Sequence, residues 1–314
     1  MSRILILAFL SFFLLGESPP LQGQRLADEI FLNVTVANKR GNYIKGLRQT
    51  NFALVDEKVE QEITAFSNAD QPVSVGILLD RSASMEPPGV KRPFMKEALA
   101  HFLDQSNNAN EYFLIGFNRQ PQLLLDWTRD TKALLEKLDT LPRAVSQTAL
   151  FDACYLALEK VTRGSHRKHA LIVISDGQDN VSHFSFIELK RSLQESDALV
   201  YAISPPPPTD FASIPGGTSV LRQEGAGILA ELTTISGGMA YVPPDIKQVT
   251  GVLERIATEL RNQYTIGFKP EISANKENYR RLKVMLKSGE KLPPEYKNLT
   301  IRSRQGYYAN STQK

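Results

Sequence analysis

The fold predicted for this chain of 314 residues rests on one stretch, Val75-Gly76-Ile77-Leu78-Leu79-Asp80-Arg81-Ser82-Ala83-Ser84. Its first five residues are apolar or glycine, which is typical of a strand buried on both faces of a parallel sheet. The polar residues that follow stand at the carboxyl end of that strand, where open α/β sheets bind their ligands. The stretch therefore predicts both a central strand and a site just beyond it.

Helices and strands alternate in the rest of this region. We predict further strands over 112–117, 122–127, 170–175, 199–203 and 239–242. We predict helices over 90–105, 130–138, 149–161, 186–195, 227–235 and 246–260. Regular alternation of this kind predicts an α/β fold, with a doubly wound, mostly parallel sheet and helices on both of its faces.

Strand-like segments flank the α/β region on both sides. Before it, 30–36 alternates apolar and polar residues with a period of two, and 52–55 and 59–66 read as a hairpin; after it come 263–268, 279–286 and 299–308. We expect 25–70 and 263–310 to form one small antiparallel β domain, into which an α/β domain of 72–261 is inserted. Two separate β appendages are the alternative, but each would have few strands and a poorly covered face.

The first residues predict export. Arg3 precedes an apolar run over 4–15, and a polar, proline-containing stretch follows over 17–24. This is the order of a secretory signal peptide, here 1–23, and twelve apolar residues are short for a membrane-spanning helix. We expect a secreted, periplasmic or envelope protein, and an uncleaved membrane anchor is the alternative.

Composition excludes some classes of protein. Hydrophobic residues make up 42% and charged residues 23% of the chain, as in ordinary globular proteins. The net charge is +3, and no basic run is interleaved with aromatic residues, so nucleic acid is not expected as a partner. Cys154 is the only cysteine, so the monomer has no disulfide, and we expect a buried, unreactive thiol there.

Polar side chains follow two of the predicted buried strands. Asp80, Ser82 and Ser84 follow the first, Asp176 follows the strand that ends at 174, and Thr148 opens a helix between them. Two carboxylates and three hydroxyls suit a hard cation such as Mg²⁺, Ca²⁺ or Mn²⁺, and do not suit zinc or copper. Taken singly, these residues also fit helix caps and turns. Together they predict one divalent-cation site, with Mg²⁺ as the first choice.

Three segments resemble the von Willebrand factor A (VWA) family. The stretch 75–84 is similar to its metal-ion-dependent adhesion site (MIDAS), Ser146-Gln147-Thr148-Ala149-Leu150-Phe151-Asp152-Ala153 to its threonine loop, and Leu171-Ile172-Val173-Ile174-Ser175-Asp176-Gly177 to its second aspartate strand. The resemblance spans about 72–261. The flanking stretches 262–268 and 304–309 look like those of a bacterial group of exported VWA-related proteins.

The resemblance implies a role for each predicted ligand. Ser82, Ser84 and Thr148 would bind the ion directly, Asp80 directly or through a neighbouring group, and Asp176 through water. Ser146 stands where many members of the family have glycine. We do not expect a further ligand in Asp179, which reads as an exposed loop carboxylate, whereas Asp152 should support the helix after Thr148 or its loop.

Three functions follow from a site of this kind. The leading hypothesis is cation-dependent adhesion or protein binding, in which the Asp or Glu of a partner protein completes the metal shell. The second is an assembly component of an envelope complex whose metal only stabilises the fold. The third is metal-assisted hydrolysis. No enzyme is expected, because Ser82 has no neighbouring histidine in the sequence and the four histidines, 101, 166, 169 and 183, share no ligand spacing.

Overall fold

The computed structural model describes residues 29–82, 84–85, 91–140, 147–206, 217–270, 279–287 and 298–308, without the side chains of 91–93 and 217–222. The predicted signal peptide and Ser146 lie outside these ranges. Within them, none of the helices has both the length and the apolar composition that a bilayer span requires.

A six-stranded sheet forms the centre of the α/β unit, in the order β10-β9-β8-β5-β6-β7. All neighbours are parallel except the edge strand β7, which is antiparallel to β6. The strands are β5 (Val73–Asp80), β6 (Glu111–Phe117), β7 (Pro121–Thr128), β8 (Lys168–Ile174), β9 (Leu199–Ile203) and β10 (Met239–Tyr241). Every residue of β5 is buried, as its unbroken apolar run predicts.

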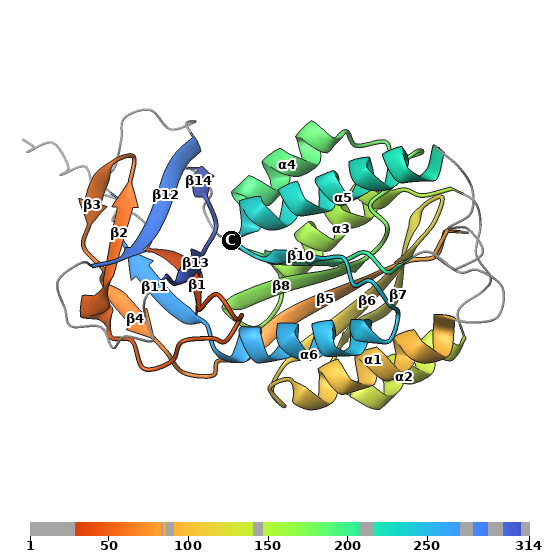
Figure 1. The fold of residues 1–314 in the computed structure, drawn as a ribbon, viewed down its shortest axis with the longest axis horizontal. Helices are drawn as coiled ribbons and strands as arrows, with labels where there is room; N and C mark the ends of the chain where they lie inside the picture. The colour runs from red at the N-terminus through yellow and green to blue at the C-terminus, as the bar shows by residue number, and fades with distance from the viewer. Residues whose placement is uncertain are drawn as a thin grey trace, which may run out of the picture.

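Helices cover both faces of this sheet (Figure 1). One face carries α1 (Lys91–Gln105), α2 (Thr131–Asp139) and α6 (Gln248–Arg261), and the other carries α3 (Leu150–Val161), α4 (Phe186–Glu195) and α5 (Gly217–Ser236). Successive residues of β5 point to opposite faces, so Ile77 packs in the core under α1 and α6, and Leu78 packs under α3, α4 and α5. The predicted fold class is confirmed.

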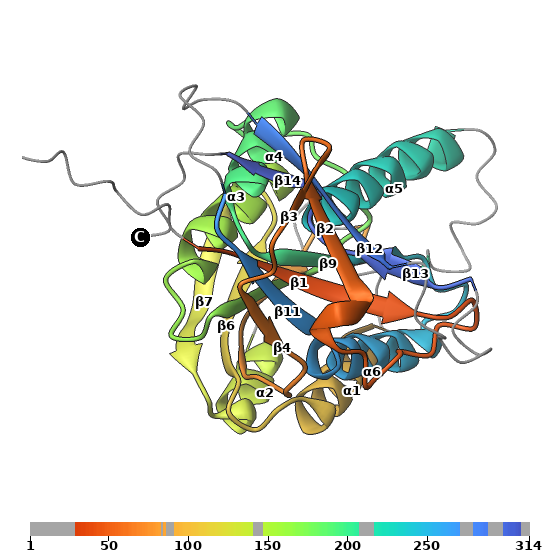
Figure 2. The same cartoon turned by 90° about the vertical axis from the view of Figure 1, so that its left-hand side faces the viewer.

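The strands from the two ends of the chain pair with each other in a β domain beside this unit (Figures 1 and 2). Two antiparallel sheets have the orders β13-β1-β11-β4 and β14-β12-β2-β3, and they share one apolar core. The strands are β1 (Ile30–Ala37), β2 (Phe52–Asp56), β3 (Val59–Gln61), β4 (Ala65–Ser67), β11 (Tyr264–Phe268), β12 (Tyr279–Leu286), β13 (Thr300–Arg302) and β14 (Gly306–Tyr308). A short 3₁₀ helix, Gln49–Asn51, precedes β2.

Two predicted strands are wrong in the same way. The segment 299–308 forms β13 and β14, which pair with β1 and β12 in different sheets. The segment 59–66 likewise divides between β3, which pairs with β2, and β4, which pairs with β11. Alternation of apolar residues continues when a chain crosses from one packed sheet to the other, so the pattern alone does not reveal the crossing.

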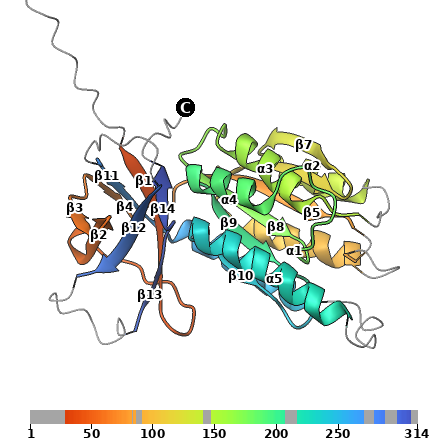
Figure 3. The ribbon, with the colours of Figure 1, turned by 90° about the horizontal axis from the view of Figure 1, so that it is seen from above.

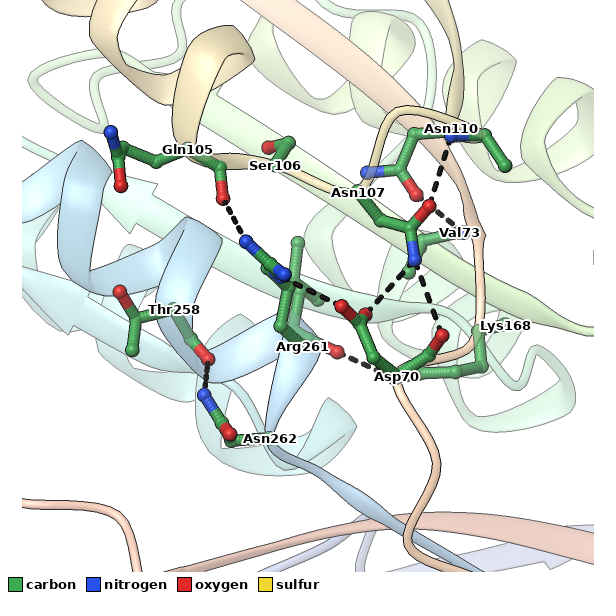
Figure 4. Close-up of polar contacts among 12 residues, drawn as sticks. Asp70, Val73, Gln105, Ser106, Asn107, Asn110, Lys168, Thr258, Arg261 and Asn262 are labelled. Carbon is green, nitrogen blue, oxygen red and sulfur yellow. Dashed lines mark hydrogen bonds and ion pairs between the residues drawn. The ribbon is translucent and has the colours of Figure 1, made fainter.

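Two connections join the β domain to the α/β unit, and they lie side by side (Figure 4). Arg261, at the end of α6, donates from Nε to Asp70 in the linker before β5 (2.8 Å). Asn107 donates to both the carbonyl and the carboxylate of Asp70. Nearby, the buried Lys168 donates from Nζ to the carbonyl of Leu260 (2.6 Å). Hydrogen bonds thus join the linker that enters the α/β unit before β5 to the segment that leaves it after α6.

Glu259 is a fully buried carboxylate at the same junction. Its Oε1 accepts from Thr35 and Tyr201 (both 2.9 Å), and its Oε2 accepts from Tyr43 (3.0 Å) and Arg302 (2.6 Å). These donors belong to both units, so a charged residue of α6 is satisfied only when the β domain is in place.

The arrangement fixes the position of the predicted site. The chain enters β5 from the β domain, so the carboxyl ends of β5, β6 and β8 lie at the far end of the α/β unit (Figures 1 and 3). The edge of the sheet that carries Asp80 therefore faces away from the β domain.

Candidate metal centre

Asp80 is the last residue of β5, and its carboxylate is held on both sides. In the register of β5 with β8, Leu79 is paired with Ile174, which sets Asp80 level with Ser175. Ser175 Oγ donates to Asp80 Oδ2 (2.6 Å), and the Ser82 N–H donates to Asp80 Oδ1 (2.8 Å). The two bonds fix the carboxylate and join it to the start of the loop after β5.

The charge of Asp80 is unfavourable where it lies. Only 5% of the residue is exposed, and burial raises the pKa of its carboxyl group to about 6. Hydrogen bonds from Ser175 and Ser82 lower that pKa, and the carboxylate of Asp176 raises it again. A cation beside the two carboxylates would favour their ionised forms, because opposite charge offsets both burial and mutual repulsion.

Two hydroxyls of the first loop lie in contact. Ser82 Oγ and Ser84 Oγ are 3.0 Å apart; Ser82 is buried and Ser84 is exposed. Two oxygens on neighbouring corners of a Mg²⁺ octahedron, each about 2.1 Å from the ion, lie about 3.0 Å from one another. The separation therefore suits a shared ion, whose open side would be the side of Ser84.

Thr148 is brought to this edge by its backbone. Its N–H donates to Asn180 Oδ1, and its carbonyl accepts from the Asn180 N–H, both at 3.0 Å. The next residue, Ala149, donates to the carbonyl of Asn118 (2.7 Å), just after β6, and Arg81 donates to the carbonyl of Phe117. The end of β6 thus joins the loop after β5 to the start of α3.

Asp176 begins the loop after β8, and α5 lies close against that loop. Asp176 Oδ1 accepts from the Gln178 N–H (3.1 Å), and Gly177 has a φ of +83°, which favours glycine. A Cβ added to Gly225 of α5 would lie 2.4 Å from the Asp176 carbonyl. The prediction that this helix begins at 227 is wrong: Gly225 looks like a helix breaker in sequence, but here it permits close packing.

The two neighbouring carboxylates have structural partners. Asp179 Oδ1 accepts from the Phe151 N–H (3.1 Å) in the first turn of α3, so this half-buried residue caps the helix and is not the exposed loop carboxylate that we predicted. Asp152 accepts from the N–H groups of His183 and Phe184 and from His183 Nδ1, so its side chain holds the loop after Asp176 and not the Thr148 loop or helix that we predicted.

Ser175 and Asn180 are site residues that the sequence reasoning missed. Ser175 orients the Asp80 carboxylate, and Asn180 holds Thr148. The register of β5 and β8 indicates the role of Ser175, because Ser175 follows the residue that pairs with Leu79. No sequence signal indicates the role of Asn180, because that role depends on how the 176–184 loop folds back on α3.

The donor set fits a hard cation. In the described part of the chain, no three His, Cys, Asp or Glu side chains gather as a metal site would need, so an ion at this edge would depend on hydroxyls and water as well as on Asp80 and Asp176. Ser82, Ser84 and Thr148 supply such hydroxyls. Joint ligation of one ion by all five residues stays a prediction.

Comparisons with known proteins bear on the fold of the α/β unit. Residues 75–178 match the sequence profile of the von Willebrand factor type A domain. The α/β unit has the VWA fold. The matched segment of the α/β unit runs from β5 to the loop after Asp176, so it includes all five predicted ligands. A comparison with curated proteins returned no match.

Solved structures share the fold at low sequence identity. Proximal thread matrix protein 1 from the mussel byssus has 15% identity and a TM-score of 0.50, over 66% of this chain and 51% of that one. Another structure of that protein, with a zinc-occupied MIDAS motif, has 15% identity and a TM-score of 0.46, over 67% of this chain and 50% of that one.

Two bacterial structures are also similar. A von Willebrand factor type A protein from Catenulispora acidiphila has 13% identity and a TM-score of 0.48, over 90% of this chain and 75% of that one. The vWF domain of the type V pili tip protein Mfa5 from Porphyromonas gingivalis has 12% identity and a TM-score of 0.46, over 60% and 95%.

Proposed function

We propose that this chain is a divalent-cation-dependent protein-binding module, in which an Asp or Glu of a partner protein completes the shell of one ion, Mg²⁺ by preference. The ion is held by Ser82, Ser84 and Thr148, with Asp80 and Asp176 acting directly or through hydrogen-bonded groups. The observation that carries the proposal is the 3.0 Å contact between Ser82 Oγ and Ser84 Oγ, beside a buried carboxylate whose pKa is raised.

An open coordination position supports an acidic partner. Two carboxylates balance the charge of a divalent ion without filling its six positions, so an exchangeable water remains on the exposed side, and a carboxylate can replace it. The site faces away from the β domain, so a partner can approach it while the β domain is attached elsewhere. We propose export to the bacterial envelope or medium on the strength of the signal-like first residues.

Exposed apolar side chains in the loop after Asp176 and at the start of α4 favour a protein as the partner. Phe184, in the loop after Asp176, is 36% exposed and stacks on Tyr155 with ring centroids 3.9 Å apart. Ile187, at the start of α4, is 78% exposed. Such side chains provide contact area around a central charged contact, as protein interfaces require.

The test is capture of a partner from an extract of the producing cells. The wild-type protein should retain the partner in Mg²⁺ and release it in chelator, and the Asp80→Ala variant should not bind it. The Glu136→Ala variant, which loses an exposed carboxylate of α2, is the matched control and should behave as wild type. If capture survives both chelator and Asp80→Ala while the metal still raises the melting temperature, the metal only stabilises the fold and the chain is an assembly component.

Metal-assisted hydrolysis is a second candidate that one observation favours. We call the edge of the sheet that carries Asp80 and Asp176 the metal edge. His183 Nδ1 lies 2.9 Å from Asp152 Oδ2, and the imidazole is exposed, so a His–Asp pair stands in the loop that leaves this edge. We rank it below binding, because Asp152 also accepts two backbone N–H bonds and thereby has a structural role. A hydrolase screen with Mg²⁺, comparing wild type with His183→Ala, tests it.

A further inference from the structure

A second candidate site lies between the two units, away from the metal edge. A cleft of about 990 Å³ separates the α4 and α5 side of the VWA domain from the face of β2 and β12 in the β domain. The views in Figures 1 and 3 place these elements opposite one another. Val55 and Ile235 give the cleft an apolar part, and a volume of this order is typical of ligand sites at domain interfaces.

The charges that line this cleft are predominantly positive. Four cations, Lys58, Lys190, Arg281 and Lys283, face two carboxylates. Glu231 forms an ion pair with Lys190 (2.6 Å), whereas Glu57 Oε1 accepts from the backbone N–H of Arg281 (2.6 Å) and keeps its charge. The remaining cations, Lys58, Arg281 and Lys283, are exposed, and no ion pair joins them to any described residue. The cleft therefore has an excess of positive charge that the described protein does not neutralise.

The backbone places these three cations in a defined pattern. Arg281 and Lys283 are two residues apart on β12, so their side chains leave the same face of the strand, about 7 Å apart. Lys58 stands in the β2–β3 turn, where Glu57 has a φ of 47° and Lys58 a φ of 79°. Asn and Gly are the residues that such a turn favours. The contact with Arg281 accounts for Glu57, whereas no contact among the described residues accounts for Lys58.

We propose that this cleft binds an extended acidic segment of a polypeptide, whose carboxylates at alternate positions contact Arg281 and Lys283, with Lys58 as a third contact. Alternate residues of an extended chain lie about 7 Å apart on one side, which matches the spacing of the two cations on β12. This site requires no metal, so the proposal does not depend on the metal-dependent function proposed above.

The test uses fluorescein-labelled hexaglutamate and fluorescence anisotropy, at low ionic strength and in chelator, so that the metal edge does not contribute. The wild-type protein and the Asp80→Ala variant should bind the peptide equally, and hexaglutamine should not bind. The double variant Arg281→Ser/Lys283→Ser should lose affinity by about tenfold or more, as expected for the loss of charged contacts.

The matched control is Lys39→Ser/Arg40→Ser, which removes the same charge from an exposed turn of the β domain outside the cleft. It should bind as wild type, and both double variants should keep the wild-type melting temperature because their altered side chains are exposed. Equal affinity of the two double variants, or no binding by wild type, would overturn the proposal. Tighter binding of heparin than of hexaglutamate, lost in the cleft variant, would replace the peptide with a sulfated glycan.

Discussion

Each oxygen of the Asp80 carboxylate already accepts a hydrogen bond, from the Ser82 N–H and from Ser175 Oγ. These bonds leave the carboxylate fixed in place, with limited freedom to turn toward an ion. Its main contributions are then its negative charge and the orientation that it gives to the Ser82 loop. Charge and hydrogen bonding can be separated by an isosteric substitution.

We therefore predict different outcomes for two substitutions of Asp80. Asp80→Asn keeps an acceptor for the Ser82 N–H but removes the charge, so it should fold and bind Mn²⁺ about 10–100-fold more weakly. Asp80→Ala also loses the acceptor and should lower the melting temperature in addition. Titration calorimetry and thermal unfolding measure the two effects. Unchanged Mn²⁺ affinity in Asp80→Asn would show that the carboxylate charge is not used.

For single residues, the sequence predicts which side chains lie at the candidate site better than it predicts the groups that hold them there. Asp80, Ser82 and Asp176 follow buried strands, so topology places them at one edge. The Asn180 contact with Thr148 joins two loops through the backbone, and residue type does not indicate it. Asp179 shows the same limit, because a helix cap supplied by a distant loop has no local signature.

Among the elements, α5 bears most directly on the metal centre. It packs against the Asp176 loop through Gly225, whereas a Cβ at Gly227, two residues further along the same helix, would meet no atom within 4 Å. Gly225 and Gly227 both stand in the interior of α5, so they differ only in the contacts that an added Cβ would make.

Substitution of each glycine by alanine tests this packing. Gly225→Ala must push α5 away from the Asp176 carbonyl, so it should reduce both stability and Mn²⁺ affinity. Gly227→Ala should raise the free energy of unfolding by about 1 kcal/mol, through helix propensity alone, and leave affinity unchanged. Urea unfolding and Mn²⁺ titration distinguish them, and equal behaviour of the two variants would contradict the close contact.

Most helices and strands of the α/β unit follow from hydrophobic periodicity. The period of 3.6 residues predicts α6, whose apolar residues are buried along one face. The β domain is harder, because β13 and β14 continue one alternating pattern across two sheets. The start of α5 was missed because glycine weakens the helical signal where the tertiary packing requires it.

Across the whole molecule, buried charges join the α/β unit to the β domain. Glu259 has donors from both units, and Lys168 lies beneath the end of α6. Burial lowers the pKa of Lys168 from 10.5 to about 8, although the charges of Asp70 and Glu259 raise it. The charged form of Lys168 is therefore less favourable in the folded protein than in the unfolded chain.

The contribution of Lys168 to the free energy of unfolding rises with pH. Between about pH 8 and 10.5 the unfolded chain holds more protons at this lysine than the folded protein does, so its contribution to stability rises with pH. Relative to Lys168→Met, the wild-type free energy of unfolding should rise by up to about 1.4 kcal/mol per pH unit in this window. Urea unfolding across that range measures it, and parallel curves for the two proteins would contradict the assignment.

The central claim is that three separate segments bind one ion at the far end of the α/β unit. Diffraction from crystals grown with Mn²⁺, recorded where manganese scatters anomalously, tests it most directly. The account predicts one strong peak, about 2.0–2.3 Å from Ser82 Oγ, Ser84 Oγ and Thr148 Oγ1, with water between the ion and Asp176. A peak elsewhere, or none with Mn²⁺ in excess, would contradict it.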